Sequence, residues 1–167
     1  MLAALDVCYH EGGGALAAAV LFETWESPRE ARAVLKPIPE VAPYEPGAFY
    51  KRELPCLLRV LEAAATPLEA IVIDGYVWLS ADARPGLGAH LFEALGEETP
   101  IIGVAKTSFQ GSSFAETLIR GRSASPLYIT AAGMKQNLAA DAVRRMSGPH
   151  RIPDLLKRVD RLCRDGR

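Results

Sequence analysis

The chain is poor in cysteine and has no long apolar run. Its three cysteines, Cys8, Cys56 and Cys163, are far apart among 167 residues and form no CxxC pair. This spacing argues against a disulfide framework and against a zinc finger, and it is typical of reduced thiols. No apolar stretch reaches the ~20 residues of a membrane span, and no basic-then-apolar leader opens the sequence. We therefore expect a cytoplasmic protein.

Composition and charge indicate one domain with two unlike halves. Apolar residues make up 49% and charged residues 23%, which argues against a disordered or fibrous chain and predicts a single domain over residues 1–167. Residues 1–100 hold 7 Lys and Arg against 15 Asp and Glu, whereas residues 101–167 hold 12 against 5. Such asymmetry indicates a basic face beside an acidic centre, unless the charges of both halves mix on a solvated surface.

Apolar runs and turn residues predict a mixed α/β fold. The first three runs, separated by glycines and prolines, predict a three-stranded antiparallel meander over residues 1–9, 15–24 and 31–35. After them we expect strands at 70–75, 100–106 and 127–131, and helices at 52–65 (with Pro55 in its first turn), 87–95, 136–146 and 153–163. The Gly- and Ser-rich stretch 107–125 predicts a loop. A meander followed by parallel strands gives a mixed sheet flanked by helices, an order that ribonuclease H-like proteins share with other α/β proteins.

Three acidic residues occupy positions where a carboxylate is unexpected. Asp6 lies within an apolar strand, Asp74 ends another strand directly before Gly75, and Glu53 opens a helix after a Pro-rich loop. Each alone has an ordinary explanation: an outward side chain, a cap or a solvated surface group. Together, carboxylates on adjacent strand ends repel one another unless they share a proton or a cation. Hard divalent cations such as Mg²⁺ suit oxygen ligands and promote phosphodiester hydrolysis.

Five short motifs, in order along the chain, resemble those of the endonuclease V family, the deoxyinosine 3′ endonucleases. They are DVCY at 6–9, PYEPG at 43–47 followed by RELP at 52–55, IDG at 73–75, IGVAK at 102–106, and RIPD at 151–154 with Asp160. The resemblance runs from Met1 to about Leu162. It implies a ribonuclease H-like fold and a Mg²⁺-dependent endonuclease, with Mn²⁺ as a substitute, that cleaves near inosine in DNA or RNA during nucleic-acid repair.

The resemblance also implies roles for individual residues. The metal-binding positions of the family fall on Asp6, Glu53, Asp74 and Asp160, and its catalytic positions fall on Asp6, Glu53, Asp74 and Lys106. Lys106 is implied to lie near the scissile phosphate, where a cation offsets developing negative charge. Tyr44 is implied to act as a stiff aromatic wedge that stacks into the gap left by a displaced base. The nucleic-acid-binding set is completed by Pro43, Pro46, Gly47 and Lys106.

The stretch after Asp74 and Gly75 departs from the family pattern. The family has a further glycine and then HPR, whereas this chain has bulky residues over 76–80 and carries one extra residue relative to that pattern. Glycines in a base pocket let the backbone approach the ring, so this change alters or fills such a pocket. Two alternatives to an inosine-specific nuclease therefore stay open: a nuclease of the same fold that cuts structured or undamaged nucleic acid, and a non-catalytic nucleic-acid-binding module.

The basic C-terminal part provides candidates for phosphate contacts, which would make nucleic-acid affinity depend on salt. These candidates are Arg120, Arg122, Lys135, Arg151, Lys157 and Arg158. No role is assigned to His10, His90 or His150.

Overall fold

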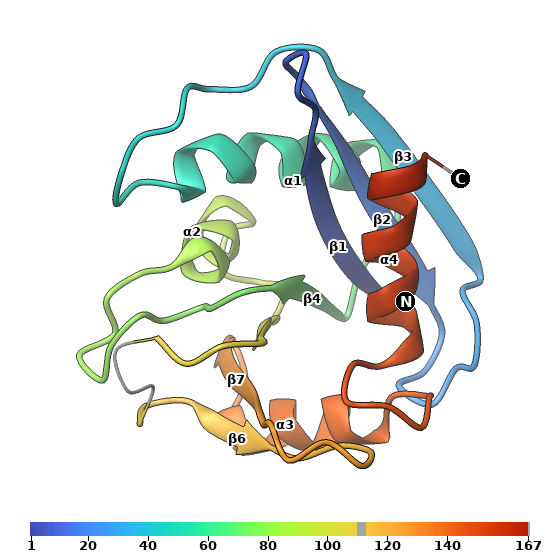
Figure 1. The fold of residues 1–167 in the computed structure, drawn as a ribbon, viewed down its shortest axis with the longest axis vertical. Helices are drawn as coiled ribbons and strands as arrows, with labels where there is room; N and C mark the ends of the chain where they lie inside the picture. The colour runs from blue at the N-terminus through green and yellow to red at the C-terminus, as the bar shows by residue number, and fades with distance from the viewer. Residues whose placement is uncertain (110–112, 167) are drawn as a thin grey trace.

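A mixed sheet of seven strands forms the centre of the molecule (Figure 1), and the computed structural model describes residues 1–109 and 113–166. The strands are β1 (Leu2–Tyr9), β2 (Ala15–Phe22), β3 (Arg32–Ile38), β4 (Ala70–Asp74), β5 (Ile101–Ala105), β6 (Glu116–Leu118) and β7 (Leu127–Ala132). Their order across the sheet is β3-β2-β1-β4-β5-β7-β6. The first three form an antiparallel meander, and β1, β4 and β5 run parallel. The last two strands are antiparallel to their neighbours.

Helices cover both faces of the sheet. They are α1 (Tyr50–Ala64), α2 (Leu87–Ala94), α3 (Gln136–Arg145) and α4 (Asp154–Asp165). The first two pack on one face, and α3 and α4 pack on the other, where α4 lies along β1 and β2 (Figure 1). No helix within the described residues is long and apolar enough to span a membrane.

The central strands are apolar on both faces, since each face is covered by helices. In β1, Leu2 and Ala4 belong to the core beneath α3 and α4, whereas Ala3 and Leu5 belong to the core beneath α1 and α2. The same alternation holds in β4 and β5. A polar residue at the end of such a strand therefore faces one helical layer or the other according to its register alone.

The expected meander, the three later strands and the four helices are confirmed, but the predicted direction of β7 is wrong. That strand runs antiparallel to β5, because a parallel neighbour needs a crossover connection, usually a helix. The connection here instead carries β6, which pairs with β7 as a hairpin.

Several bounds also differ from the predictions. The strand expected at 31–35 extends through Pro37 to Ile38. The stretch 107–125 contains β6, whose three residues include a single buried side chain, Leu118, and so have too little apolar pattern to predict a strand. Residues 110–112 of that stretch lie outside the described residues. The first helix begins at Tyr50, so Pro55 lies in its second turn rather than its first and has no N–H to donate to the carbonyl four residues earlier.

Candidate active site

Three polar side chains project from one face of the sheet at the carboxyl ends of its parallel strands. In β1, Asp6 follows Leu2 and Ala4 at two-residue intervals, and those side chains belong to the core on the α4 side. Asp74 ends β4, and Lys106 comes directly after β5, with the same alternation behind them. Because alternate residues of a strand share a face, all three polar side chains meet on the side that α4 covers.

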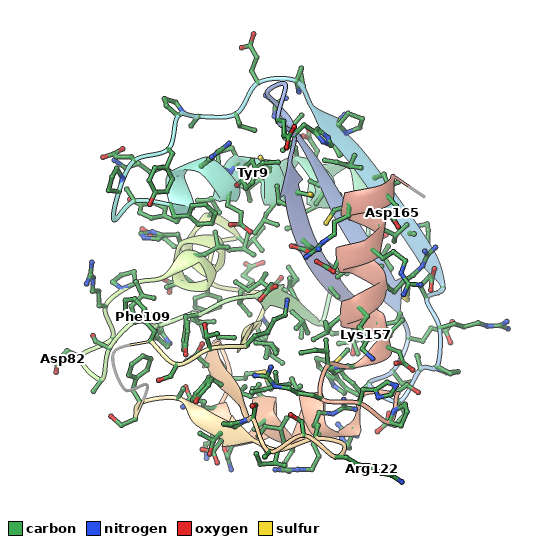
Figure 2. All side chains as sticks on the ribbon, viewed as in Figure 1. Tyr9, Asp82, Phe109, Arg122, Lys157 and Asp165 are labelled. Atoms are coloured by element: carbon green, nitrogen blue, oxygen red, sulfur yellow. The ribbon has the colours of Figure 1, made fainter. Side chains whose placement is uncertain are left out.

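Helix α4 completes this group from above the sheet. Lys157 and Asp160 are three positions apart, so they share one helix face, and they line a cavity together with Asp6, Asp74 and Lys106. We call this space the acidic cavity. It measures about 110 Å³, and its other walls are apolar: Leu5, Ile73, Val104, Ile152, Leu156 and Val159. Figure 2 labels Lys157 on the lower part of α4.

Asp6 is partly desolvated and lies close to other carboxylates. Its pKa is raised to about 6, chiefly by burial and also by the charges of Asp74 and Asp160. The backbone N–H of Val7 donates to Asp6 Oδ1 at 2.8 Å and acts in the opposite direction. On α4, the Oδ1 atom of Asp160 accepts a hydrogen bond from Arg164 Nε at 3.0 Å. Asp6 therefore lies in a partly desolvated position beside two other carboxylates.

Glu53 reaches the same carboxylates from the opposite face of the sheet. It occupies the core-facing stripe of α1 that also contains Cys56, Leu57 and Val60, and it is 9% exposed. Its pKa is raised to about 8, first by burial and then by the charges of Asp6 and Asp74. An ionised carboxylate in such a position is unfavourable unless positive charge compensates it.

Lys106 provides positive charge inside the acidic cavity. Its Nζ atom lies 2.5 Å from Asp74 Oδ2, and both side chains remain 42% exposed. The pair is thus accessible to solvent and to a ligand from outside. Sequence reasoning placed both residues at this site, and the structure brings them into direct contact.

The chemistry of the donor set fits a hard divalent cation. Asp6, Glu53, Asp74 and Asp160 offer carboxylate oxygens, which Mg²⁺ and Mn²⁺ prefer, and a shared cation relieves their mutual repulsion. Within residues 1–109 and 113–166, no three Asp, Glu, His or Cys side chains lie close enough together to hold a metal ion without moving. Their assignment as ligands therefore stays a prediction.

A second concave region, which we call the aromatic hollow, lies on the other side of Asp74. Its lining includes Gly47 from the loop before α1, Tyr50 of α1, Tyr76 from the stretch after Gly75, and His90 of α2. The rings of Tyr50 and His90 stack with centroids 3.6 Å apart and an angle of 16° between their planes. Because Asp74 borders both spaces, a group held in the aromatic hollow lies next to the carboxylates of the acidic cavity.

The loop that precedes α1 projects Tyr44 outward. Its side chain is 62% exposed, and its ring centroid lies 6.5 Å from that of Phe49. The loop is stabilised where Lys51 Nζ contacts Glu45 Oε2 at 3.0 Å. Of the expected nucleic-acid-binding residues in this loop, Gly47 reaches the aromatic hollow, whereas Tyr44, Pro43 and Pro46 are exposed.

The bulky stretch after Gly75 is fixed to the end of the sheet. The Val77 N–H donates to Thr130 Oγ1 at 2.8 Å, and Trp78 Nε1 donates to the carbonyl of Ala131 at 2.8 Å. The stretch passes so close to β5 that a Cβ atom at Gly103 would lie 2.6 Å from the Gly75 carbonyl oxygen. Val77 and Trp78 thus act in packing.

Tyr76 differs from these two residues because it borders the aromatic hollow. Its hydroxyl donates to the carbonyl of Thr107 at 2.7 Å, and its ring lies near Phe109 and Phe114, with centroids 6.1 and 6.0 Å away. A tyrosine therefore forms part of a wall where the family pattern has small residues.

Three of the basic residues expected to contact phosphate instead have partners within the chain. Arg120 is buried, and its guanidinium donates to backbone carbonyls of the segment between α3 and α4. Arg151 donates to the carbonyls of Lys106 and Pro126. Arg158 is engaged with Glu30 at 2.8 Å. Sequence alone could not separate these arginines from exposed ones, because their partners are backbone carbonyls or distant residues.

Two further features of the site were missed in the sequence. The Arg52 guanidinium lies over the ring of Tyr9, 4.0 Å from its centroid, and neither Arg52 Nε nor the Tyr9 hydroxyl has a hydrogen-bond partner among the described residues. The stack of Tyr50 on His90 was also unexpected. The three-residue spacing of Tyr50 and Glu53 indicates a shared helix face, but no sequence signal pairs a residue of α1 with one of α2.

Comparison with known proteins gives a consistent family. The sequence matches the family model described as Endonuclease V over residues 1–152. A Streptomyces avermitilis protein named Endonuclease V is 34% identical over 185 positions, covering 96% of this chain and 77% of that protein. The Thermus thermophilus Endonuclease V is 33% identical over 113 positions, covering 66% of this chain but 47% of that protein. The chain thus aligns with about three quarters of one relative and about half of the other.

Solved structures agree with this assignment. The Ciona intestinalis Endonuclease V, in complex with a 23mer DNA containing an inosine followed by a ribo-adenosine, gives a TM-score of 0.84 at 17% identity over 99% of this chain and 84% of that one. The Streptomyces avermitilis Endonuclease V gives a TM-score of 0.75 at 25% identity over 99% and 80%. The expected ribonuclease H-like fold is confirmed by these neighbours. The chain belongs to the endonuclease V family.

Proposed function

We propose that this protein is a metal-dependent endonuclease that hydrolyses a phosphodiester near a deaminated base, inosine, in DNA or RNA. The observation that carries the proposal is the convergence of Asp6, Asp74 and Asp160 on one solvent-accessible cavity with Lys106 beside them. Family membership supports the nuclease activity. The complexes of the Ciona intestinalis relative with inosine-containing DNA support the substrate class.

The carboxylates would hold the metal, and Mg²⁺ with Mn²⁺ as substitute suits their oxygen atoms. We assign Asp6, Glu53, Asp74 and Asp160 to this role. The raised pKa values of Asp6 and Glu53, caused chiefly by burial, support it, because these groups lack enough positive charge of their own. A divalent cation bound there would supply an activated water molecule and stabilise the leaving oxygen.

Lys106 would act on the phosphate rather than on the metal. Its ammonium group is bound to Asp74 on one side and exposed on the other. A phosphate that enters the acidic cavity would find this charge fixed beside it, and a fixed cation stabilises the negative charge that develops on phosphate oxygens. Lys157 lines the same cavity from α4 and can contribute a second positive charge to binding.

The aromatic hollow and the loop before α1 would hold the base. A nucleobase displaced from its stack gains favourable contact with aromatic rings, and the stacked Tyr50 and His90 form such a surface. Tyr44 projects from the same loop that provides Gly47 to the hollow. This arrangement suits a wedge that fills the place of the displaced base.

Cleavage of a matched oligonucleotide set tests the proposal. The set contains a deoxyinosine DNA, an inosine RNA and their undamaged counterparts, each with Mg²⁺, Mn²⁺ or EDTA. We expect nicking near inosine with metal and none with EDTA. Asp6→Asn, Asp74→Asn and Asp160→Asn should each lose nearly all turnover, whereas Asp165→Asn, on the exposed end of α4 (Figure 2), should retain it. An Asp6 or Asp74 variant with wild-type rates would refute the metal assignment.

One observation favours a second candidate, a nuclease of the same fold with a structured or undamaged substrate. Tyr76 occupies part of the hollow wall and is fixed by its hydrogen bond to Thr107. Equal cleavage of inosine-containing and undamaged members of the set would favour this candidate. Binding of every member without turnover in any metal would favour a non-catalytic binding module.

A further inference from the structure

Lys106 is tied to the rest of the molecule through its own backbone. The strand β5 ends at Ala105, which pairs with Tyr128 of β7, so Lys106 lies just beyond the last pair of the ladder. Its carbonyl oxygen accepts a hydrogen bond from Arg151 Nη2 at 2.5 Å. The same guanidinium nitrogen also donates to the carbonyl of Pro126, the residue before β7, at 2.8 Å. Arg151 therefore joins the end of one strand to the start of its neighbour.

Arg151 is itself held by a buried arginine. The segment between α3 and α4 has carbonyls at Met146, Gly148 and His150 that all accept from the Arg120 guanidinium, with 3.3 Å to Gly148 and 2.6 Å to His150. Arg120 is 7% exposed. Because a guanidinium has five N–H donors in a rigid plane, it fixes several carbonyls of one segment at once.

The approach of this segment to the loop after β6 is close enough to require glycine. At Gly121, a Cβ atom would lie 2.6 Å from the Pro149 carbonyl oxygen, and the residue has a φ of +62°. The backbone directly before Arg151 is thus confined by packing as well as by hydrogen bonds. Arg151 therefore extends from a confined backbone, and its two hydrogen bonds to carbonyls hold the guanidinium in place.

These contacts form a continuous path from Arg120 through the 146–151 segment to Arg151, then to the Lys106 carbonyl, and from Lys106 Nζ to Asp74 Oδ2 at 2.5 Å. We propose that Arg151 is a positioning residue that fixes Lys106 beside Asp74 in the acidic cavity. This inference rests on the proposed nuclease function for its kinetic consequences, but the placement of Lys106 is a separate, measurable claim.

Arg151 could instead contact a phosphate, but its hydrogen-bond geometry argues against this role. Its Nη2 atom is already directed at two carbonyls, and its Nε atom is buried without a hydrogen-bond partner in the described part of the chain. Arg122, by contrast, is exposed at the lower edge of the molecule in the view of Figure 2.

The first arm of the test measures the placement of Lys106 without relying on activity. Metal-free wild type, Arg151→Gln and Arg151→Lys are treated briefly with an amine-acylating reagent, and the acylation rate of each lysine is read by mass spectrometry. In Arg151→Gln we expect Lys106 to react several-fold faster, because it is no longer held against Asp74, while exposed Lys135 keeps its rate. An unchanged Lys106 rate in a folded variant overturns the proposal.

The second arm uses turnover and a double-mutant comparison. Since a displacement of about 1 Å in a reacting group can lower rates by about 100-fold, we expect Arg151→Gln to lower kcat at least tenfold with little change in KM. In a Lys106→Met background the same change should cost less than about twofold. Arg59→Gln, at an exposed position on α1, is the matched control and should leave kcat unchanged. Equal effects in both backgrounds would assign Arg151 to general structure and refute positioning.

Salt dependence and a conservative variant complete the design. Loss of a phosphate contact would flatten the plot of log affinity against log salt by roughly one unit per contact, so an unchanged slope in Arg151→Gln supports positioning and a flatter slope contradicts it. If the glutamine variant unfolds, Arg151→Lys decides the question, with an intermediate acylation rate expected. A wild type without turnover on any substrate refutes the proposed function, and the acylation arm then still tests the placement of Lys106.

Discussion

Replacing Glu53 by glutamine should make the metal-free protein more stable, and increasingly so as the pH rises. The pKa of Glu53 in the folded protein is about 8, against an ordinary value of 4.5, because the side chain is buried beside Asp6 and Asp74. Below pH 4.5 this carboxyl is protonated in both the folded and the unfolded chain and does not affect folding. Between 4.5 and about 8 the unfolded chain gives up the proton first, so stability is lost as the pH rises through this range.

The size of the effect follows from the two pKa values. One pKa unit corresponds to about 1.36 kcal/mol, so the change from 4.5 to about 8 lowers the free energy of unfolding by roughly 3 kcal/mol at pH 7 and by roughly 5 kcal/mol above pH 8. Glutamine has nearly the same shape and no charge to desolvate. A gain of roughly 3 kcal/mol raises Tm by roughly 6–12 °C in a chain of this length.

Thermal and urea unfolding in EDTA at pH 5 and pH 8 measure this effect. Glu62→Gln, an exposed position on the same helix, is the matched control and should change stability by no more than about 0.5 kcal/mol at either pH. Mg²⁺ should then raise the Tm of wild type more than that of Glu53→Gln, because binding to the folded state stabilises it by mass action. A stability gain that is the same at both pH values would refute the desolvated, carboxylate-crowded position of Glu53.

Three further outcomes are expected. Tyr44→Ala should leave Tm unchanged, since the side chain is 62% exposed. It should weaken binding of an inosine oligonucleotide, measured by fluorescence titration, by roughly 10- to 100-fold, which corresponds to the loss of one base stack. Unchanged affinity would exclude the wedge role. Gly103→Ala should lower the free energy of unfolding by roughly 2 kcal/mol or more in urea, because its Cβ atom would lie 2.6 Å from the Gly75 carbonyl oxygen, and a neutral result would contradict that close approach. The hydrogen bond from Arg158 lowers the pKa of Glu30, so the pair stabilises the fold above pH 4.5 and loses its effect as the pH falls; Glu30→Gln should cost at most about 1 kcal/mol at pH 7 and less under acidic conditions.

The sequence predicted those parts of the fold that depend on local pattern. The apolar runs that became β1, β2, β4 and β5 are continuous because both faces of the sheet are covered, and their ends are marked by glycine and proline. The antiparallel direction of β7 was not predictable in the same way, since it depends on the hairpin with β6. Strand β6 has one buried residue, Leu118, so its sequence has almost no apolar pattern that could predict a strand.

The site shows the same division between local and long-range information. Asp6 and Asp74 could be grouped because both lie on apolar strands expected to be adjacent, and Lys106 could be added through the family motif; the structure places all three around one cavity. The buried guanidinium of Arg120 could not be distinguished from a surface charge, because its partners are backbone carbonyls about 26 to 30 positions further along the chain. Composition counts such a residue as part of a basic face although it is absent from the surface.

The two concave regions meet at Asp74, and the proposed function assigns base recognition to one of them and bond cleavage to the other. Glu53, a proposed metal ligand, also borders the aromatic hollow. The acidic cavity is built on the α4 side of the sheet from strand ends and one helix face, whereas the aromatic hollow is built from α1, α2 and the stretch after Gly75. Tyr76 can therefore change the shape of the hollow while Asp6, Lys106 and Asp160 keep their positions. A substitution such as Tyr76→Gly is accordingly expected to alter which nucleic acids are cut without changing the metal requirement, and a change in both would mean that the two regions are not independent.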